Sequence, residues 1–232
     1  MSPIILSFDG NIGSGKSSIV KYFENNFEDY CNKKKNNNYK ICFLQEPVKE
    51  WEQIIDKETN ENIIQKYYKD NEKYAFAFQM MAYISRLNLL KKALEKDYDI
   101  IITERSIYTD KNVFAKMLFS EKKINDIEWQ IYNLWFNEFD DIVKNIKTIY
   151  IRTSPEICQN RIIKRNRLGE DISYEYLKNC NYYHEHWLNS IEEIKKNKIL
   201  IINGNEETNT SAFINNTYYD DLMSSVYNYI HH

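Results

Sequence analysis

The stretch Ile4-Ile-Leu-Ser-Phe-Asp9, followed by Gly10-Asn-Ile-Gly-Ser-Gly-Lys-Ser17, decides the fold class of this chain. Its first part is short and apolar, which is typical of a strand buried on both faces of a parallel sheet. Its second part matches GxxxxGK followed by Ser or Thr, between a strand and a helix. Glycines let the backbone wrap around phosphate oxygens, while amides and the helix N-terminus point at the anion. The stretch therefore predicts a nucleoside triphosphate site in an α/β fold.

Nine consecutive residues make up the expected donor site. They are Gly10, Asn11, Ile12, Gly13, Ser14, Gly15, Lys16, Ser17 and Ser18. Lys16 is expected to neutralise the β- and γ-phosphates, and the Ser17 hydroxyl to ligate Mg²⁺. The motif alone does not separate a kinase from a GTPase or a motor. Because the chain lacks an NKxD sequence and its 232 residues are few for a motor, a small kinase is favoured.

Short apolar runs alternate with helical patterns along the rest of the chain. The predicted strands are Ile4–Phe8, Lys40–Gln45, Ile100–Thr103, Thr148–Arg152 and Ile199–Ile202. The predicted helices are Lys16–Cys31, Asn71–Glu95, Ile107–Phe119, Asp126–Asn145, Pro155–Ile163, Tyr174–Lys195 and Tyr218–Tyr229. This alternation predicts a five-stranded parallel sheet flanked by helices. The length of 232 residues suits one domain over residues 1–232.

The charge and composition exclude several classes of protein. Lys and Arg number 31 against 34 Asp and Glu, a net charge of −3, whereas general nucleic-acid binders are usually strongly basic. We therefore expect no nucleic-acid polymer as a partner. No apolar run reaches the ~18 residues of a membrane span, so no membrane association is expected. The four cysteines show no CxxC spacing, which favours free thiols in a reducing compartment and a cytoplasmic location.

Charged residues follow the second and third predicted strands, at the edge where open parallel sheets bind ligands. Glu46 stands at the tip of the second strand, where a carboxylate can accept a proton from an acceptor hydroxyl. Glu104 and Arg105 end the third strand. There Glu104 could hold Mg²⁺, and Arg105 could reach a phosphate or the acceptor hydroxyl. The alternatives are a surface carboxylate before a turn for Glu46 and a structural ion pair for Glu104 and Arg105.

The predicted helix Asn71–Glu95 is apolar on nearly all sides, yet it contains Gln79 and Arg86. These two residues are seven positions apart and share one face with Ala82 and Tyr83. A buried amide and a buried guanidinium need hydrogen-bond partners. A planar polar ligand would satisfy both groups, and other protein groups are the alternative.

Three arginines, Arg161, Arg165 and Arg167, stand close to the acidic residues Glu170 and Asp171. Clustered arginines of this kind favour a lid over transferring phosphates, here spanning about residues 161–173. A basic solvated helix face is the alternative explanation for the same spacing.

Together these motifs resemble the deoxyribonucleoside kinases, which include deoxycytidine, deoxyguanosine and mitochondrial thymidine kinases. The resemblance runs from Ile4 to about Asn205, on the strings FDGNIGSGKSS, QEPVKEW, YAFAFQMMAYISR, ERSIYTDKNVFA, RIIKRNR and YEYL with HEHWL. It implies a P-loop kinase fold with an Arg-rich lid, with ATP and Mg²⁺ as cofactors. It also implies phosphorylation of the 5′-hydroxyl of a 2′-deoxyribonucleoside. Segments 52–65 and 205–216 have no counterpart in it.

The resemblance implies a role for each matched position. Glu46 corresponds to the general base for the 5′-hydroxyl, and Arg105 to the arginine that contacts the 5′-oxygen. Gln79 corresponds to the amide that reads the base, and Glu104 with Ser17 to the Mg²⁺ site. The remaining matches are the aromatic walls Trp51, Phe78 and Phe114, the sugar-binding pair Tyr68 and Glu170, the lid residues Arg161, Arg165 and Arg167, and the adenine loop with Asn205 and Glu206.

Three positions bear on the choice of base. Thymidine-preferring members of the family carry apolar residues at the positions of Arg86 and Asp110. Deoxycytidine and purine kinases carry an Arg–Asp pair there, with a small residue at the position of Ala82. This sequence has Ala82, Arg86 and Asp110, which predicts purine deoxynucleosides or deoxycytidine as substrates in preference to thymidine. A charged floor under the base offers no apolar surface to the thymine methyl group.

The family is dimeric through a pair of helices, so the resemblance also implies a homodimer. The predicted helices Ile107–Phe119 and Asp126–Asn145 are the candidates here. The second carries more aromatic residues than one core-facing stripe requires: Trp129, Tyr132, Trp135, Phe136 and Phe139.

Two other functions remain open on the sequence. A nucleoside monophosphate kinase of the thymidylate type would need a second anion site for the acceptor's own phosphate, which Glu46 would repel. A non-catalytic nucleotide-binding protein would not need Glu46, Arg105 and the lid arginines together. Mg-ATP with a panel of deoxynucleosides and their monophosphates separates the three functions.

Overall fold

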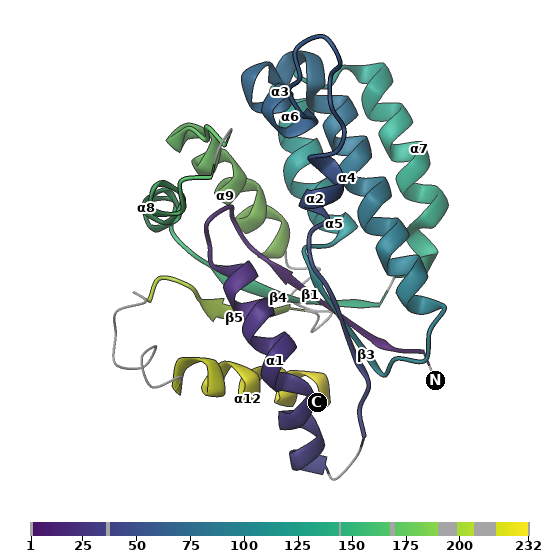
Figure 1. The fold of residues 1–232 in the computed structure, drawn as a ribbon, viewed down its shortest axis with the longest axis vertical. Helices are drawn as coiled ribbons and strands as arrows, with labels where there is room; N and C mark the ends of the chain where they lie inside the picture. Colours follow the sequence, from purple (N-terminus) through teal and green to yellow (C-terminus); the bar gives the residue numbers. More distant parts are fainter. Residues whose placement is uncertain are drawn as a thin grey trace.

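Five parallel strands form one sheet in the order β2-β3-β1-β4-β5 (Figure 1). The computed structural model describes residues 2–35, 38–143, 145–167, 170–189, 199–206 and 217–231. The strands are β1 (Ile4–Asp9), β2 (Ile41–Leu44), β3 (Ile100–Glu104), β4 (Ile146–Arg152) and β5 (Ile199–Asn203). All five predicted strands are confirmed, and no bound shifts by more than two residues.

The register of the central strands fixes where the charged residues meet. Strand β1 lies between β3 and β4, with Phe8 beside Glu104 and Asp9 beside Tyr150. The residues Ile5–Asp9 are all buried, as the apolar run predicts. The glycine-rich loop after β1 therefore begins next to the end of β3, and the predicted phosphate and metal residues share one edge of the sheet.

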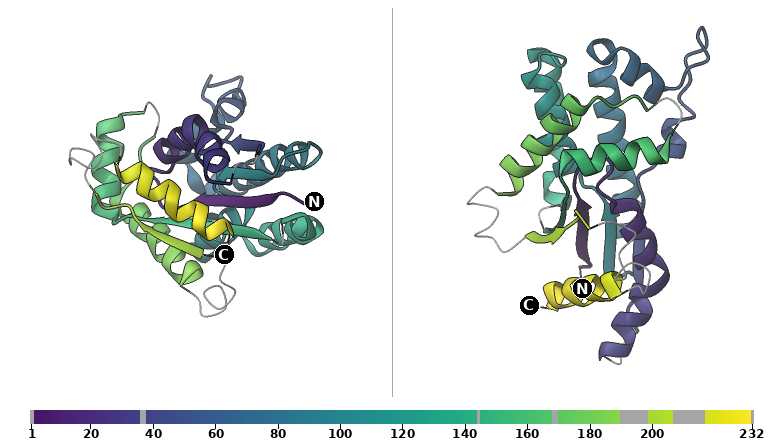
Figure 2. Two further views of the ribbon diagram at one scale, coloured as in Figure 1. Left: turned by 90° about the horizontal axis from the view of Figure 1, so that it is seen from below. Right: turned by 90° about the vertical axis from the view of Figure 1, so that its left-hand side faces the viewer.

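Helices cover both faces of the sheet. The long ones are α1 (Lys16–Lys35), α4 (Asn71–Leu94), α7 (Asp126–Val143), α8 (Pro155–Arg165), α9 (Tyr174–Leu188) and α12 (Thr217–His231). Helix α12 lies across α1 (Figure 2), and both contribute to a core in which Phe23 and Val226 pack with Leu6 and Ile102 of the sheet. On the other face, α4, α7 and α9 share a second core that contains Tyr83 and Tyr132. The predicted α/β class is confirmed.

Two helices before α4 were not predicted. The four-residue helix α2 (Val48–Trp51) begins directly after Pro47, and α3 (Ile63–Lys69) lies partly in the segment without a counterpart in the family. A capping box begins α3: Asn62 Oδ1 accepts from the Gln65 amide at 3.0 Å, and Gln65 Oε1 accepts from the Asn62 amide at 2.9 Å. Asn and Gln three positions apart before an apolar run are a sequence signal for the start of a helix.

The prediction of one regular helix over Ile107–Phe119 is wrong. The segment divides into a single turn α5 (Ile107–Thr109), a π-helix η1 (Asp110–Ala115) and α6 (Lys116–Ser120). Short π-helical segments occur mostly as single turns inside α-helices, and they are frequent at functional sites. Here η1 packs against both α4 and α9 and carries Asp110 and Phe114 to the cavity described below.

The remaining predicted helices are confirmed with adjusted ends. The helix from Asp126 ends at Val143 because β4 begins at Ile146, earlier than predicted. The helix from Tyr174 is described to Leu188, and residues 190–195 of its predicted range lie outside the described residues. No described helix combines the length and apolarity that crossing a membrane requires.

Candidate active site

The carboxyl ends of the strands border a cavity of about 1020 Å³. Its walls come from the loop after β1, the turn and helix after β2, the end of β3, η1 and one face of α4. The predicted site residues that line it are Ile12–Ser18, Glu46, Trp51, Tyr68, Phe78, Gln79, Ala82, Arg86, Glu104, Arg105, Asp110, Phe114, Arg161, Arg165, Arg167 and Glu170. The predicted residues outside this lining are Gly10, Asn11, Asn205 and Glu206.

Two glycines give the phosphate loop its shape. Gly13 and Gly15 have φ angles of +79° and +98°, in the left-handed region that side chains disfavour. A Cβ on Gly13 would lie 2.6 Å from the Cys158 carbonyl oxygen of α8, whereas a Cβ on Gly15 would meet nothing closer than Arg161 Nη1 at 3.6 Å. Gly13 thus permits close packing on α8, and Gly15 provides the backbone conformation at the cavity.

Lys16 lies folded onto this loop. Its Nζ donates to the carbonyl oxygens of Gly10 at 3.0 Å and Asn11 at 2.7 Å, and to Ser14 Oγ at 3.3 Å. Burial, together with the nearby positive charge of Arg105, lowers the pKa of Lys16 to about 7. A bound polyphosphate would supply the negative charge that this buried ammonium lacks.

Asn11 differs from its expected place. Its side chain is buried, donates from Nδ2 to the Leu177 carbonyl at 2.9 Å, and accepts from the Ile12 amide at 2.8 Å. Asn11 therefore ties the loop to α9 instead of facing the cavity. Gly10 lies behind the loop, where its carbonyl accepts from Lys16 and from Arg105 Nη1.

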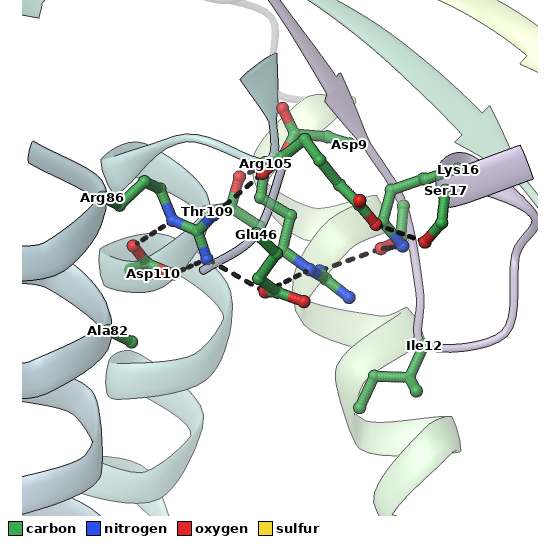
Figure 3. A network of polar contacts seen from close by, with 12 residues as sticks. Asp9, Ile12, Lys16, Ser17, Glu46, Ala82, Arg86, Arg105, Thr109 and Asp110 are labelled. Atoms are coloured by element: carbon green, nitrogen blue, oxygen red, sulfur yellow. Dashed lines mark hydrogen bonds and ion pairs between the residues drawn. The ribbon is translucent and has the colours of Figure 1, made fainter. Parts of the chain in front are cut away.

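A chain of ion pairs crosses the centre of the cavity (Figure 3). Arg86 Nε donates to Asp110 Oδ2 at 2.9 Å, and Arg86 Nη2 donates to Glu46 Oε1 at 3.0 Å. Arg105 Nε lies 3.6 Å from the same Oε1. Burial would raise the pKa of Glu46, but Arg86 and Arg105 outweigh it and hold that pKa below its usual value. Glu46 is therefore a carboxylate at neutral pH.

Arg105 is held in a conformation that few residues adopt. Its φ is +65°, in the left-handed region, and non-glycine residues kept there often mark functional sites. Its Nη1 donates to the Gly10 carbonyl at 3.0 Å, and its guanidinium lies 4.8 Å from the centre of the Phe114 ring. Arg105 therefore connects the phosphate loop, the carboxylate of Glu46 and an aromatic wall.

Two side-chain oxygens meet at the expected metal site. Ser17 Oγ donates to Glu104 Oε1 at 2.6 Å. Mg²⁺ usually binds one or two protein oxygens together with waters and substrate phosphates, so this pair beside Lys16 fits that ion. Among the described residues, no cluster of three or more His, Cys, Asp or Glu side chains could hold a metal alone.

Aromatic rings form one wall of the cavity. Trp51 and Phe78 meet edge to face at 5.7 Å, and Phe78 stacks on Tyr67 at 4.4 Å. The Trp51 Nε1–H donates a hydrogen bond to Ser85 Oγ at 2.9 Å. The rest of the indole is therefore an apolar surface on the cavity lining. Gln79 is 2 % exposed and lies on the same lining as Ala82 and Arg86. The cavity lining therefore offers both aromatic faces and polar side-chain atoms.

The lid arginines have different partners. Arg161 donates to the carbonyls of Ser14 at 3.1 Å and Glu206 at 2.8 Å, and Arg165 pairs with Glu170. Arg167 lines the cavity. The Glu170 carboxylate, which the resemblance assigns to the sugar, is therefore bound to a lid arginine.

The expected adenine loop is described only up to Glu206. Asn205 Oδ1 accepts from the Ser154 amide at 2.8 Å, at the start of α8, and Glu206 contributes its carbonyl to Arg161. These contacts hold the loop against α8. Residues 207–216 lie outside the described residues.

Comparison of the sequence with known proteins identifies the family of this chain. The family model described as deoxynucleoside kinase matches residues 6–231. The chain belongs to the deoxynucleoside kinase family. It is therefore a phosphotransferase of a family that uses a nucleotide phosphate donor and acts on nucleosides.

Individual relatives cover nearly the whole chain. A fowlpox virus protein named "Probable deoxycytidine kinase" is 34% identical over 232 residues, covering 96% of this chain and 89% of its own. Deoxycytidine kinase 2 of Gallus gallus is 30% identical, covering 94% and 89%. Mitochondrial deoxyguanosine kinase of Xenopus laevis is 30% identical, covering 89% and 84%.

Several residues of the site were not predicted from the sequence. Tyr67 and Tyr176 line the cavity and join hydroxyl to hydroxyl at 2.9 Å. Asp9, buried at the end of β1, accepts from Ser7 Oγ at 2.5 Å and from Thr109. The tyrosines lie on α3 and α9 and meet only through folding, so no local signal was available. Asp9, in contrast, directly precedes the glycine-rich motif, and a buried acid there could have been noticed.

Proposed function

We propose that this enzyme transfers the γ-phosphoryl group of ATP to the 5′-hydroxyl of a 2′-deoxyribonucleoside. The observation that carries the proposal is the position of Glu46. It lies in one cavity with the phosphate loop and the aromatic wall of Trp51 and Phe78. A nucleoside with its base against that wall would bring its 5′-hydroxyl toward Glu46 and the phosphates.

Different side chains of the protein have different roles in the transfer step. Glu46 takes the proton of the 5′-hydroxyl while the 5′-oxygen forms a bond to the γ-phosphorus. The bond between that phosphorus and the β,γ-bridging oxygen breaks, and ADP leaves with the electron pair. Lys16, Arg161 and Arg165 balance the negative charge that develops on the phosphoryl oxygens. The products are ADP and a deoxynucleoside 5′-monophosphate, and Glu46 returns its proton to solvent.

Ser17 and Glu104 are the residues that would hold Mg²⁺. The ion would neutralise part of the negative charge of the phosphate groups. Lys16 begins α1, Ser17 is the next residue of the same helix, and Glu104 ends β3. Both ligands therefore sit on rigid elements at the same edge of the sheet as Lys16.

Purine deoxynucleosides or deoxycytidine are the proposed substrates, with thymidine a poor one. Arg86 and Asp110 are both buried and pair at 2.9 Å on the lining of the cavity beside Ala82. Fixed polar groups of this kind disfavour a ligand that leaves them unpaired. The similarity to proteins named deoxycytidine and deoxyguanosine kinases supports the same preference.

The chain is proposed to be one domain that forms a homodimer and to close residues 161–173 as a lid. Exposed apolar side chains on α7 support the dimer, namely Ile127 and Leu134, both 71 % exposed, with Ile84 of α4 at 49 %. The expected partner helix Ile107–Phe119 contributes buried residues instead, and Tyr132 and Phe136 of α7 belong to the core. The dimer face therefore consists of α7 and α4, and Leu134→Glu should shift the molar mass measured by light scattering to that of a monomer.

The proposed compartment is a reducing one such as the cytoplasm. Cys31, Cys42, Cys158 and Cys180 are all free thiols. Burial raises the pKa of Cys31 and of Cys180 to about 12, which keeps both thiols protonated and unreactive.

One assay tests the proposed activity. Purified protein is incubated with Mg-ATP and a panel of four deoxynucleosides and their monophosphates, and ADP and the phosphorylated product are measured. We expect 5′-monophosphates from deoxynucleosides. Turnover of monophosphates alone would indicate the thymidylate type of kinase, and no turnover of any compound would contradict the proposal.

A further inference from the structure

The guanidinium of Arg86 joins the nucleobase side of the cavity to its catalytic side. Nε donates to Asp110 Oδ2 at 2.9 Å, Nη1 to the Glu104 carbonyl at 2.8 Å, and Nη2 to Glu46 Oε1 at 3.0 Å. These partners come from η1, β3 and the turn after β2. Because a guanidinium is planar, its orientation toward Asp110 also fixes its orientation toward Glu46.

The two carboxylate oxygens of Glu46 are not equivalent. Arg86 Nη2 contacts Oε1 at 3.0 Å, and Arg105 Nε lies 3.6 Å from the same atom. Within the part of the chain that the structure describes, the hydrogen bond and the ion pairs of the Glu46 carboxylate all fall on Oε1. Oε2 is therefore the oxygen with lone pairs available to a ligand, and the Glu46 side chain is 26% exposed on the cavity lining.

Charged and titratable groups from several elements lie close to Glu46. They are Lys16 of α1, Tyr68 of α3, Arg86 of α4, Arg105 after β3 and Asp110 of η1. Arg86 is the strongest of the groups that keep Glu46 ionised, ahead of Arg105 and Lys16. Asp110 acts in the opposite direction, because two carboxylates repel each other.

We propose that Arg86 is a positioning residue for Glu46, so that one side chain serves both the nucleobase site and the proton-transfer step. Arg86 fixes Oε1, and the free Oε2 accepts the 5′-hydroxyl proton. This inference rests on the proposed function, since it assigns a role to Glu46 in that reaction. A substitution that changes base preference through Arg86 should then also change the chemical step.

A matched pair of variants separates the two roles. Asp110→Ala removes the Arg86–Asp110 pair but leaves Arg86 on Glu46. Asp110→Ala combined with Arg86→Met also removes the hydrogen bond from Arg86 to Glu46. Because both members of the Arg86–Asp110 pair are replaced, neither leaves an unpaired charge in the core. The readout is the pH dependence of kcat between about pH 5 and 8, with saturating ATP and Mg²⁺. 2′-Deoxyguanosine is the acceptor, because its base does not change protonation over that range.

The double variant is expected to differ from the single variant in the chemical step. Without Arg86, the pKa of Glu46 rises, so kcat should fall toward the acidic end of the range and lie at least about tenfold lower at neutral pH. In Asp110→Ala the pKa of Glu46 stays low, so the profile should keep the wild-type shape while KM rises. A role limited to base recognition would raise KM in both variants and leave the shapes of the two kcat profiles alike, and that result would overturn the inference.

A folding control and one further variant keep the outcomes distinct. Thermal unfolding shows whether each variant is folded. Arg86→Lys tests the planar geometry of the guanidinium, because one ammonium cannot contact Asp110 and Glu46 in the same geometry. Arg86→Lys should shift the pH profile in the same direction as the double variant. If wild-type protein phosphorylates no deoxynucleoside, the proposed function fails. If wild-type protein is active and Glu46→Gln is inactive, equal profiles in the variant pair contradict only the role of Arg86.

Discussion

The Ser17 hydroxyl donates a 2.6 Å hydrogen bond to Glu104 Oε1, although the two residues are 87 positions apart in the sequence. The sheet register creates this contact, because β1 pairs with β3 and both strands end at the phosphate loop. A hydroxyl and a carboxylate oxygen at one point match the ligand preference of Mg²⁺. The pair thus links the order of the strands to the proposed metal dependence.

Glu104→Gln is expected to raise the free Mg²⁺ concentration needed for half-maximal activity, because an amide oxygen carries no negative charge. The measurement is initial rate against free Mg²⁺ at constant ATP. Glu175→Gln is the control, since Glu175 is an exposed carboxylate of α9 that pairs with Lys178. A Glu104→Gln curve that coincides with wild type would place the metal elsewhere.

Lys16→Ala should abolish phosphoryl transfer while the protein stays folded. Among the described residues, the Lys16 ammonium donates only to its own loop, to Gly10, Asn11 and Ser14, so its loss leaves the two cores intact. Activity and far-UV circular dichroism are compared with those of Lys21→Ala, which removes an exposed lysine of the same helix. A folded Lys16→Ala protein with normal ATP-dependent turnover would defeat the assignment of the phosphate loop.

Glu46→Gln is expected to bind nucleoside nearly normally and to lose turnover. The amide keeps the size of the side chain and its contact with Arg86 but cannot take a proton, and general base catalysis typically contributes ~10²–10⁴-fold. Nucleoside binding is measured by calorimetry and kcat by steady-state kinetics. Glu24→Gln is the control, because Glu24 contacts the neighbouring Gln45 at 3.1 Å on the exposed surface. A near wild-type kcat for Glu46→Gln would show that another group is the base.

Much of the fold follows from local patterns in the sequence. Apolar runs such as Ile4–Phe8 and Ile100–Thr103 are buried strands because both faces of the sheet are covered. The glycine-rich motif specifies its own loop, since its spacing and positive φ angles are local properties. The presence of a buried Gln79 and Arg86 in an apolar helix also predicted polar partners or a polar ligand.

The contacts between distant segments could not be predicted in the same way. The Arg86–Glu46 pair spans 40 positions and depends on how far the turn after β2 reaches toward α4. The π-helix at Asp110–Ala115 depends on packing against α4 and α9. No pattern in its own residues predicts the wider turn. The contact of Asn11 with Leu177 depends on the fold in the same way, because 166 positions separate the two residues.

Arg86→Met combined with Asp110→Ala should raise the ratio of kcat/KM for thymidine to that for deoxyguanosine. The thymine methyl group would then meet apolar surface in place of the buried ion pair, and purines would lose their polar partners. The ratio is the measurement, because freeing Glu46 lowers turnover of both substrates together. The single variant Ala82→Gly, on the same face of α4, is the control, because it enlarges the cavity without changing its charge. Thymidine as the best wild-type substrate, or an unchanged ratio, would contradict this account of base choice.

His184 should make the protein sensitive to acid. It is fully buried, with Nδ1 2.7 Å from the Cys180 carbonyl and its ring stacked on Tyr150. Burial, aided by the charge of Arg105, lowers its pKa to about 3 from the usual 6.5. Between these two pH values the unfolded chain binds more protons than the folded one, so the free energy of unfolding should decrease as pH falls, by about 1.4 kcal/mol per pH unit from this group.

Urea unfolding from pH 7 downward measures the free energy of unfolding against pH. His184→Phe should reduce the slope of this dependence. His186→Gln, which removes an exposed histidine of the same helix, should leave the slope steep. Equal slopes for wild type and His184→Phe would mean that His184 does not carry the effect.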